Sequence, residues 1–207
     1  MSTIKMIFRS LEHRNYRLYF GGQAISLTGT WMQNIAMSWL VYRLTNSAFL
    51  LGVVGFAGQI PSLVLTPYTG VFADRYNKHR IIAITQTLSM IQALGLAALT
   101  LTNTINIFLI ITLSLILGII NAFDAPARQA FVVELVERRE DLPNAIALNS
   151  FLFNGARLVG PSVAGLLIAL IGEGMCVLVN GLSYIGGIWA LLAMRIQRPA
   201  VKSTHAN

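Results

Sequence analysis

Long stretches without a charged side chain constrain this chain more than any other feature of its sequence. No Asp, Glu, Lys or Arg occurs in residues 18–42, 44–73, 81–123, 158–172 and 174–194 of the 207. Charged residues make up 11% of the chain, whereas soluble domains contain about 25%. Because a helix needs roughly 20 apolar residues to cross a bilayer, these stretches predict an all-α membrane protein.

Two of these stretches do not correspond to single spans. Residues 81–123 are too long for one helix, and the polar sequence TNTIN at 102–106 indicates a turn between two. Residues 158–172 are too short, so this span is extended back through Arg157 to about residue 145. We therefore predict a bundle over 18–194 with six transmembrane helices, at about 18–42, 50–72, 81–101, 105–123, 145–171 and 175–194. Strands are not expected, because a helix satisfies its backbone hydrogen bonds within one segment.

Basic residues are distributed unevenly over the predicted loops. Thirteen Lys and Arg residues lie in residues 1–17, in the loops after the second and fourth helices and in residues 195–207. The opposite side has only Arg43, and Arg157 lies inside a span. Because Lys and Arg are enriched in cytoplasmic loops, both tails are predicted to be cytoplasmic in a multi-pass protein of the cell membrane. The net charge of +7 then belongs to the inner membrane face, and no nucleic-acid partner is expected.

The loop after the second predicted helix has a specific order of residues. The sequence GVFADRYNKHR places Gly70, Asp74, Arg75 and Lys78 in an arrangement that resembles the G-x-x-x-D-R-x-G-R-K/R signature of the major facilitator superfamily. Asn77 replaces the usual Gly, and Asn adopts the left-handed conformation more readily than most residues. Lys78 keeps the charge of the commoner Arg without its planar fork. A tight turn at Asn77 is therefore expected.

Two later segments extend the resemblance. Residues 121–136, NAFDAPARQAFVVELV, and 144–167, NAIALNSFLFNGARLVGPSVAGLL, are similar to the branch of the superfamily that contains enterobactin exporters and multidrug and macrolide efflux proteins. Gly160, Pro161 and Gly165 resemble the Gly-Pro motif in the fifth helix of its antiporters. The resemblance implies the amino-terminal half of a twelve-helix fold, with a three-plus-three inverted repeat within the half.

The resemblance also implies a role for the loop signature. In the superfamily this loop is a cytoplasmic latch, in which the Asp meets a helix N-terminus of the other half and the basic residues meet an acid at the end of the fourth helix. A carboxylate is favoured at a helix N-terminus by about 0.3 to 1 kcal/mol. The expected latch residues are Gly70, Asp74, Arg75, Lys78 and Asp124, with Lys78 and Asp124 as partners.

Polar side chains recur along the first predicted helix at intervals of three or four residues. They are Gln23, Ser26, Thr30, Gln33 with the adjacent Asn34, and Ser38. This spacing places them on one helix face, which meets protein or water because lipid penalises polar groups. They either form hydrogen bonds to neighbouring helices or line a substrate cavity, where the resemblance places the first and fourth helices. Trp31 would offer an aromatic surface to a ring-bearing or cationic substrate.

The fourth and fifth predicted helices add further cavity candidates. Ser114 occupies the position where many antiporter relatives have an arginine, so the coupling ion stays open. Arg157 lies deep in a span, where a charge is functional by default. It is either a structural cation held by carbonyls and Asn154, or a cavity cation that binds an anionic substrate or contacts an acid of the other half. The expected cavity residues are Gln23, Thr30, Trp31, Gln33, Asn34, Ser114, Asn121 and Arg157.

The rest of the sequence contains few motifs that indicate a binding or catalytic site. Residues 124–145 look like a short amphipathic helix on the cytoplasmic membrane surface. There is no phosphate-binding glycine loop, metal-ligand cluster or nucleophile beside a base, so no cofactor, metal or enzymatic activity is expected. Cys176 is the single cysteine, which excludes an internal disulfide.

These expectations combine into one functional hypothesis. The chain is interpreted as the amino-terminal half of a secondary active transporter that exports amphipathic small molecules, drugs or siderophores, by alternating access. Its expected partners are the small-molecule substrate, the lipid bilayer and the missing carboxy-terminal six-helix half. The alternatives are a truncated, non-transporting membrane fragment and a half-transporter that works as a dimer with a second copy.

Overall fold

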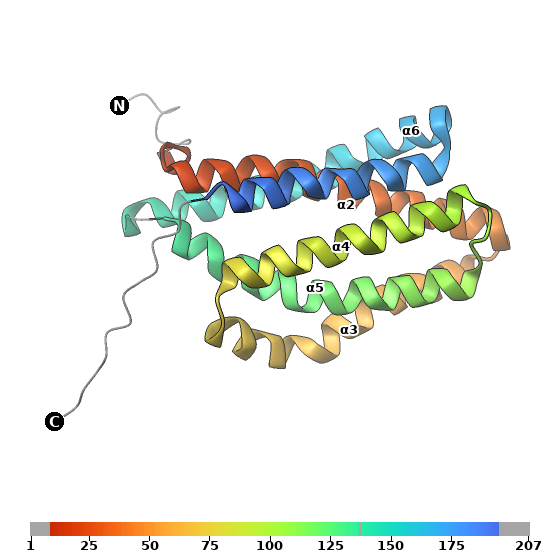
Figure 1. Cartoon of the computed structure of the whole chain (residues 1–207), viewed down its shortest axis with the longest axis horizontal. Coiled ribbons are helices and arrows are strands. Elements are labelled where there is room, and N and C mark those ends of the chain that lie inside the picture. Colours follow the sequence, from red (N-terminus) through yellow and green to blue (C-terminus); the bar gives the residue numbers. More distant parts are fainter. Residues whose placement is uncertain (1–8, 137, 195–207) are drawn as a thin grey trace.

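The computed structural model describes residues 9–136 and 138–194 as an elongated helical bundle (Figure 1). A short 3₁₀ helix, η1 (Arg9–Glu12), precedes the long helices α2 (Arg14–Thr45), α3 (Ala48–Arg75) and α4 (Lys78–Leu101). Then follow α5 (Ile107–Leu135), the 3₁₀ helix η2 (Arg139–Asp141) and α6 (Leu142–Leu192). Of the two predicted tails, residues 1–8 and 195–207 lie outside the described residues.

The number of helices differs from the prediction of six spans. The described residues contain five long helices and no strand, and both of the last two predicted spans lie within α6. Gly172 interrupts α6 with a φ of 81° and a ψ of 166°, and the helix doubles back there (Figure 1). By length and hydropathy α3, α4, α5 and α6 qualify as membrane spans, whereas α2 with its polar stripe does not. An all-helical membrane fold is therefore supported, while the six spans and the inverted repeat stay predictions.

Asparagine and serine side chains set several of the helix ends. The turn between α2 and α3 runs through Asn46 in the left-handed conformation, with a φ of 47°. Ser47, Asn77 and Asn106 then cap α3, α4 and α5, each accepting a hydrogen bond from the backbone N–H three residues later. The expected tight turn at Asn77 is present, because α3 ends at Arg75 and α4 begins at Lys78, but Asn77 has a φ of −67° and serves as the N-cap instead of adopting the left-handed conformation.

Helix α5 is longer than the predicted span at 105–123. It continues through Pro126 to Leu135, so most of the expected surface helix at 124–145 is the end of α5. The extension is stabilised by burial, because Phe131, Val132 and Leu135 pack in a core cluster with Tyr16 and Tyr19 of α2. Asp124 and Arg128 therefore belong to the bundle and not to a surface segment.

Close helix contacts depend on small residues. Helix α2 packs mainly against α6, α3 packs against α5, and α4 lies against α5 and α6. A Cβ atom on Gly160 would lie 2.5 Å from Trp31 Cβ and 3.1 Å from the carbonyl oxygen of Thr28, so this glycine lets α6 approach α2. A Cβ atom on Gly165 would have no neighbour within 4 Å, so Gly165 does not serve the same contact.

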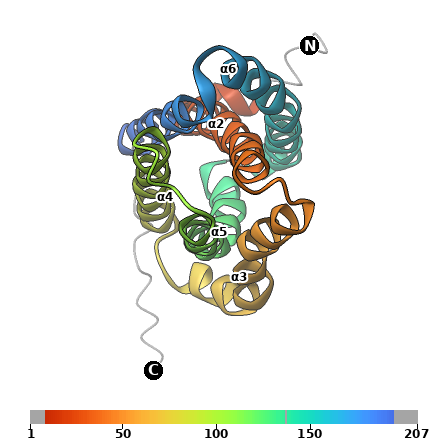
Figure 2. The ribbon, with the colours of Figure 1, turned by 90° about the vertical axis from the view of Figure 1, so that its right-hand side faces the viewer.

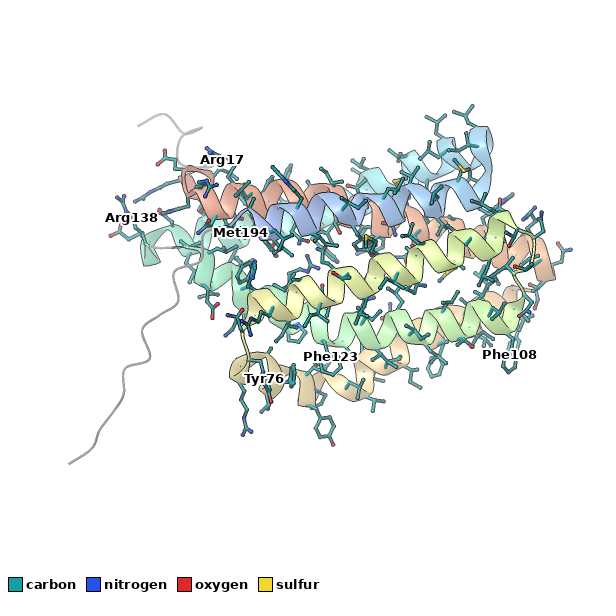
Figure 3. The ribbon with its side chains drawn as sticks, viewed as in Figure 1. Arg17, Tyr76, Phe108, Phe123, Arg138 and Met194 are labelled. Carbon is teal, nitrogen blue, oxygen red and sulfur yellow. The ribbon has the colours of Figure 1, made fainter. Side chains whose placement is uncertain are left out.

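The two ends of the bundle differ in charge. Arg17 and Arg138 lie at the end that also holds the α3–α4 turn, whereas Phe108 marks the other end (Figure 3). That other end holds the turn between α2 and α3 and the break in α6, and its Arg43 forms an ion pair with Glu173. The charge asymmetry that the sequence indicated therefore runs along the long axis of the bundle.

Candidate functional site

Two adjoining hollows form a central cleft between α2, α3, α5 and the first part of α6, four helices seen end-on in Figure 2. One hollow has a volume of about 360 Å³ and the other of about 510 Å³. Both are lined by Thr30, Asn34, Gln59 and Asn121, so the two hollows adjoin. We refer to the two together as the central cleft.

The cleft lining combines apolar residues with carboxamides, two aromatic rings and one charged pair. Six carboxamide side chains line it: Asn34, Gln59, Asn121, Gln129, Asn149 and Asn154. Trp31 and Phe153 add two aromatic rings, with centroids 5.9 Å apart in an edge-to-face contact. Carboxamides both donate and accept hydrogen bonds, so this lining suits a ligand that carries oxygen or nitrogen groups next to an apolar body.

Five of the eight expected cavity residues line this cleft. They are Thr30, Trp31, Asn34, Ser114 and Asn121. Thr30 also contacts the Tyr184 hydroxyl at 3.1 Å, which ties the cleft wall to the second part of α6. Ser114 donates a hydrogen bond to the carbonyl oxygen of Ile110, so its hydroxyl is already partnered within α5.

Gln33 and Gln23 lie away from the cleft. The Gln33 side chain is buried and joins three helices, because it accepts from Asn180 Nδ2 at 2.6 Å and donates to Gln92 Oε1 at 3.2 Å. Gln92 in turn donates to the carbonyl oxygen of Leu113 on α5. For Gln33 the structure therefore supports interhelical hydrogen bonding, which was the alternative to a cavity role.

Gln23 is also buried, and it follows Gly22, where α2 and α6 are in close contact. Its Oε1 has no hydrogen-bond partner, and neither has Nε2 of the buried Gln86 on α4. Ser26 donates a long hydrogen bond of 3.5 Å to Gln86 Oε1. A Cβ atom on the neighbouring Gly22 would lie 2.6 Å from Ala190 Cβ, so this part of α2 is packed against α6.

A charged pair forms the end of the cleft at α5. Arg128 Nε donates to Asp124 Oδ2 at 2.7 Å, and Thr85 Oγ1 on α4 donates to Asp124 Oδ1 at 2.6 Å. Both charged side chains are largely buried, with exposed fractions of 15% for Asp124 and 18% for Arg128. Arg128 Nη1 and the Tyr19 hydroxyl lie buried next to them without a hydrogen-bond partner.

The predicted ion pair between Lys78 and Asp124 is wrong. Lys78 Nζ lies 2.8 Å from Glu134 Oε1, ten residues further along α5 than Asp124. The prediction failed because it ended the fourth span at residue 123, whereas α5 continues to Leu135 and carries Glu134 to the α4 N-terminus. Asp124 is instead a residue of the central cleft.

The other expected latch residues lie at the end of α3. Asp74 and Arg75 are exposed in its last turn, and no ion pair involves either of them within residues 9–136 and 138–194. Gly70 lies one turn earlier, where a Cβ atom would have no neighbour within 4 Å. The latch role of these residues is not tested by these contacts and stays a prediction.

Arg157 lies on α6 beside the cleft. Its guanidinium carbon is 5.6 Å from the centre of the Trp31 ring, a cation–π arrangement. The cleft residues Ser150, Phe153 and Asn154 precede it on the same helix face at intervals of three or four residues. Asn154 Nδ2 donates to the carbonyl oxygen of Ser150, and among the described residues no hydrogen bond joins Asn154 Oδ1 to the guanidinium, although one interpretation expected this contact.

Several cleft residues were not predicted from the sequence. They are Gln59, Arg128, Gln129, Asn149, Ser150 and Phe153. The i, i+4 spacing of Asp124 and Arg128 was a usable signal, because such pairs meet on a helix. Among the described residues no cluster of three potential metal-binding side chains occurs.

A third cavity, of about 460 Å³, lies between the end of α3 and helices α4 and α5. Phe72, Tyr76 and Phe123 line it together with isoleucine side chains, and Figure 3 shows Tyr76 and Phe123 on the same side of the bundle. Because few polar groups are available to orient a ligand, the central cleft is the stronger candidate site.

Comparisons with known proteins agree with this arrangement. The chain is 29% identical to a staphyloferrin A transporter of Staphylococcus aureus, over 87% of this chain and 46% of the relative. It is 27% identical to the multidrug efflux pump Tap of Mycolicibacterium fortuitum and 26% identical to macrolide efflux protein A of Streptococcus pyogenes. These alignments cover 79% and 75% of this chain, and 41% and 39% of the two relatives.

The chain thus spans less than half the length of these relatives. No solved structure matches it. Residues 6–206 match the family described as transmembrane secretion effectors. On this match over nearly the whole chain, together with its apolar helices and efflux relatives, the protein belongs to the transmembrane secretion effector family of the major facilitator superfamily.

Proposed function

We propose that this chain is the amino-terminal half of a secondary active transporter that exports amphipathic small molecules, such as drugs or siderophores. The observation that carries the proposal is the central cleft, in which carboxamides and two aromatic rings lie between apolar helices. Lipid would penalise such a lining, so it is suited to a ligand or to water. The relatives' printed names, a siderophore transporter and two efflux proteins, agree with this substrate class.

Transport in this proposal proceeds by alternating access. A second six-helix half, or a second copy of this chain, would cover the open side of the cleft, and the two would rock against each other. The tails and the α3–α4 turn would face the cytoplasm, because the basic residues gather at that end. A truncated fragment without transport activity is the competing interpretation.

The latch belongs to the same proposal. Asp74 is exposed in the last turn of α3, where it is free to meet a helix N-terminus of the other half. In the complete transporter, Asp74→Asn would keep the shape and remove the charge. It should lower the efflux rate while protein abundance stays nearly unchanged, and an unaltered rate would refute the latch.

The deciding experiment uses the complete reading frame in a bacterial strain that lacks its own efflux pumps. Retention of a panel of dyes, antibiotics and siderophores is measured with and without a proton gradient. Gradient-dependent loss of at least one compound supports export, and the 207-residue chain expressed alone tests whether a second copy suffices. Equal retention of every compound with and without the expressed protein would leave the non-transporting fragment as the interpretation.

A further inference from the structure

The charges around the central cleft are not balanced. Asp124 is the only acidic side chain among the described residues that line it. Both of its carboxylate oxygens are occupied, one by Arg128 and the other by Thr85. A cationic ligand would therefore have to displace a buried arginine to reach a carboxylate, which is costly because the arginine would lose its counter-charge.

Arg157 differs from Asp124 in its charge partners. It is not among the lining residues of either hollow, but it follows Phe153 and Asn154, which line one of them, by one turn on the same face of α6. Within the described parts of the chain no acid lies within ion-pair distance of it, and its recorded contact is with the Trp31 ring. A guanidinium next to a membrane-spanning cleft without a counter-charge favours an anion, which it binds through two parallel hydrogen bonds.

The surroundings of Arg157 define the rest of the ligand. Trp31 lies beside the guanidinium and Phe153 packs edge-to-face against Trp31, and Asn34 and Asn154 line the same hollow as these two rings. From these contacts we infer that the cleft selects amphipathic anions, with a carboxylate or similar oxyanion on Arg157 and a ring or apolar body against Trp31 and Phe153. This inference rests on the proposed function, because it specifies the substrate class of the same cleft.

The test compares two dyes that share a fluorophore and differ in charge. Dansylglycine carries a carboxylate and dansylcadaverine an ammonium group. The 207-residue chain is purified in dodecyl maltoside with Trp39→Phe and Trp189→Phe, so that Trp31 in the cleft is the sole tryptophan. Energy transfer from Trp31 to the dansyl group then reports binding at the cleft, and empty micelles correct for partitioning of the dyes.

We expect dansylglycine to bind about tenfold more tightly than dansylcadaverine, the size of one charge-assisted hydrogen-bonded contact. Arg157→Gln should remove this preference by weakening dansylglycine alone, and Arg157→Lys should retain part of it because Lys keeps the charge without the fork. Arg17→Gln, an exposed arginine at the charged end, is the matched control and should change neither affinity.

The other possible outcomes contradict either the anion selectivity or the cleft as a binding site. Tighter binding of dansylcadaverine, or an Arg157→Gln variant that still prefers dansylglycine, refutes the anion selectivity and leaves the export proposal standing. Absence of energy transfer with both dyes refutes the inference and also removes the cleft as a binding site, which would count against the proposed function itself.

Discussion

The two sides of helix α2 show how one polar stripe serves two purposes. Thr30, Trp31 and Asn34 line the central cleft, whereas Gln23 and Gln33 are buried against α4 and α6. Gln33 makes interhelical hydrogen bonds to Gln92 and Asn180, whereas the Asn34 amide lines the cleft, where a ligand can reach it. Spacing along a helix therefore identifies which residues avoid lipid, but the partner of each one is set by the packing of the other helices.

The largest expected effect concerns the ion pair at the end of the cleft. Arg128→Gln leaves Asp124 largely buried with only Thr85 as partner, so we expect a loss of about 3 kcal/mol in the free energy of unfolding. Unfolding is followed in detergent with a thiol-reactive fluorophore, because the single cysteine, Cys176, is buried.

The matched control for this prediction is the double variant Asp124→Asn with Arg128→Gln. It removes both charges at nearly constant volume and should recover at least half of the lost stability, since no unpaired charge remains. Equal stability of the parent and the single variant would show that water already solvates Asp124.

The next effect tests the close contact between α2 and α6. Gly160→Ala places a methyl group against Trp31 Cβ and the Thr28 carbonyl, and overpacking of this kind costs about 1 to 3 kcal/mol. Gly165→Ala, five residues along the same helix, has open space and should be neutral or slightly stabilising. If both variants unfold at the same denaturant concentration, the two helices do not approach at Gly160.

A third pair of variants separates the two sides of α2 directly. Gln33→Leu leaves Asn180 Nδ2 and Gln92 Oε1 without the hydrogen-bond partner that Gln33 supplies, which should cost about 1 to 3 kcal/mol of folding free energy. Asn34→Ala removes a cleft amide and should leave the unfolding free energy within about 0.5 kcal/mol, as for most surface substitutions. Ligand affinity should fall in Asn34→Ala and stay nearly unchanged in Gln33→Leu. An Asn34→Ala variant with a clearly lowered free energy of unfolding would contradict the assignment of Gln33 to packing and of Asn34 to the cleft.

The sequence predicted the fold better than the site. Apolar runs and loop charges predicted a helical membrane bundle, because lipid imposes the same requirement on every span. The end of α5 was missed, since the charged residues after position 123 resemble a surface segment and only tertiary burial of Phe131 and Leu135 keeps them helical. The site depended on that end: Asp124 and Arg128 reach the cleft, and Glu134 reaches Lys78, because α5 continues.

The smallest expected effect decides which acid Lys78 contacts. The pair between Lys78 and Glu134 is partly exposed, with 53% of the Glu134 side chain accessible, so its coupling energy should be about 0.5 kcal/mol or less. A double-mutant cycle with Lys78→Gln and Glu134→Gln measures this coupling as the deviation from additivity. A second cycle with Lys78→Gln and Asp124→Asn should give a value near zero, because Asp124 is held by Arg128 and Thr85. If the Asp124 cycle gave the larger coupling, Lys78 would contact the end of the cleft after all, and the separation of the cleft from the loop after α3 would have to be abandoned.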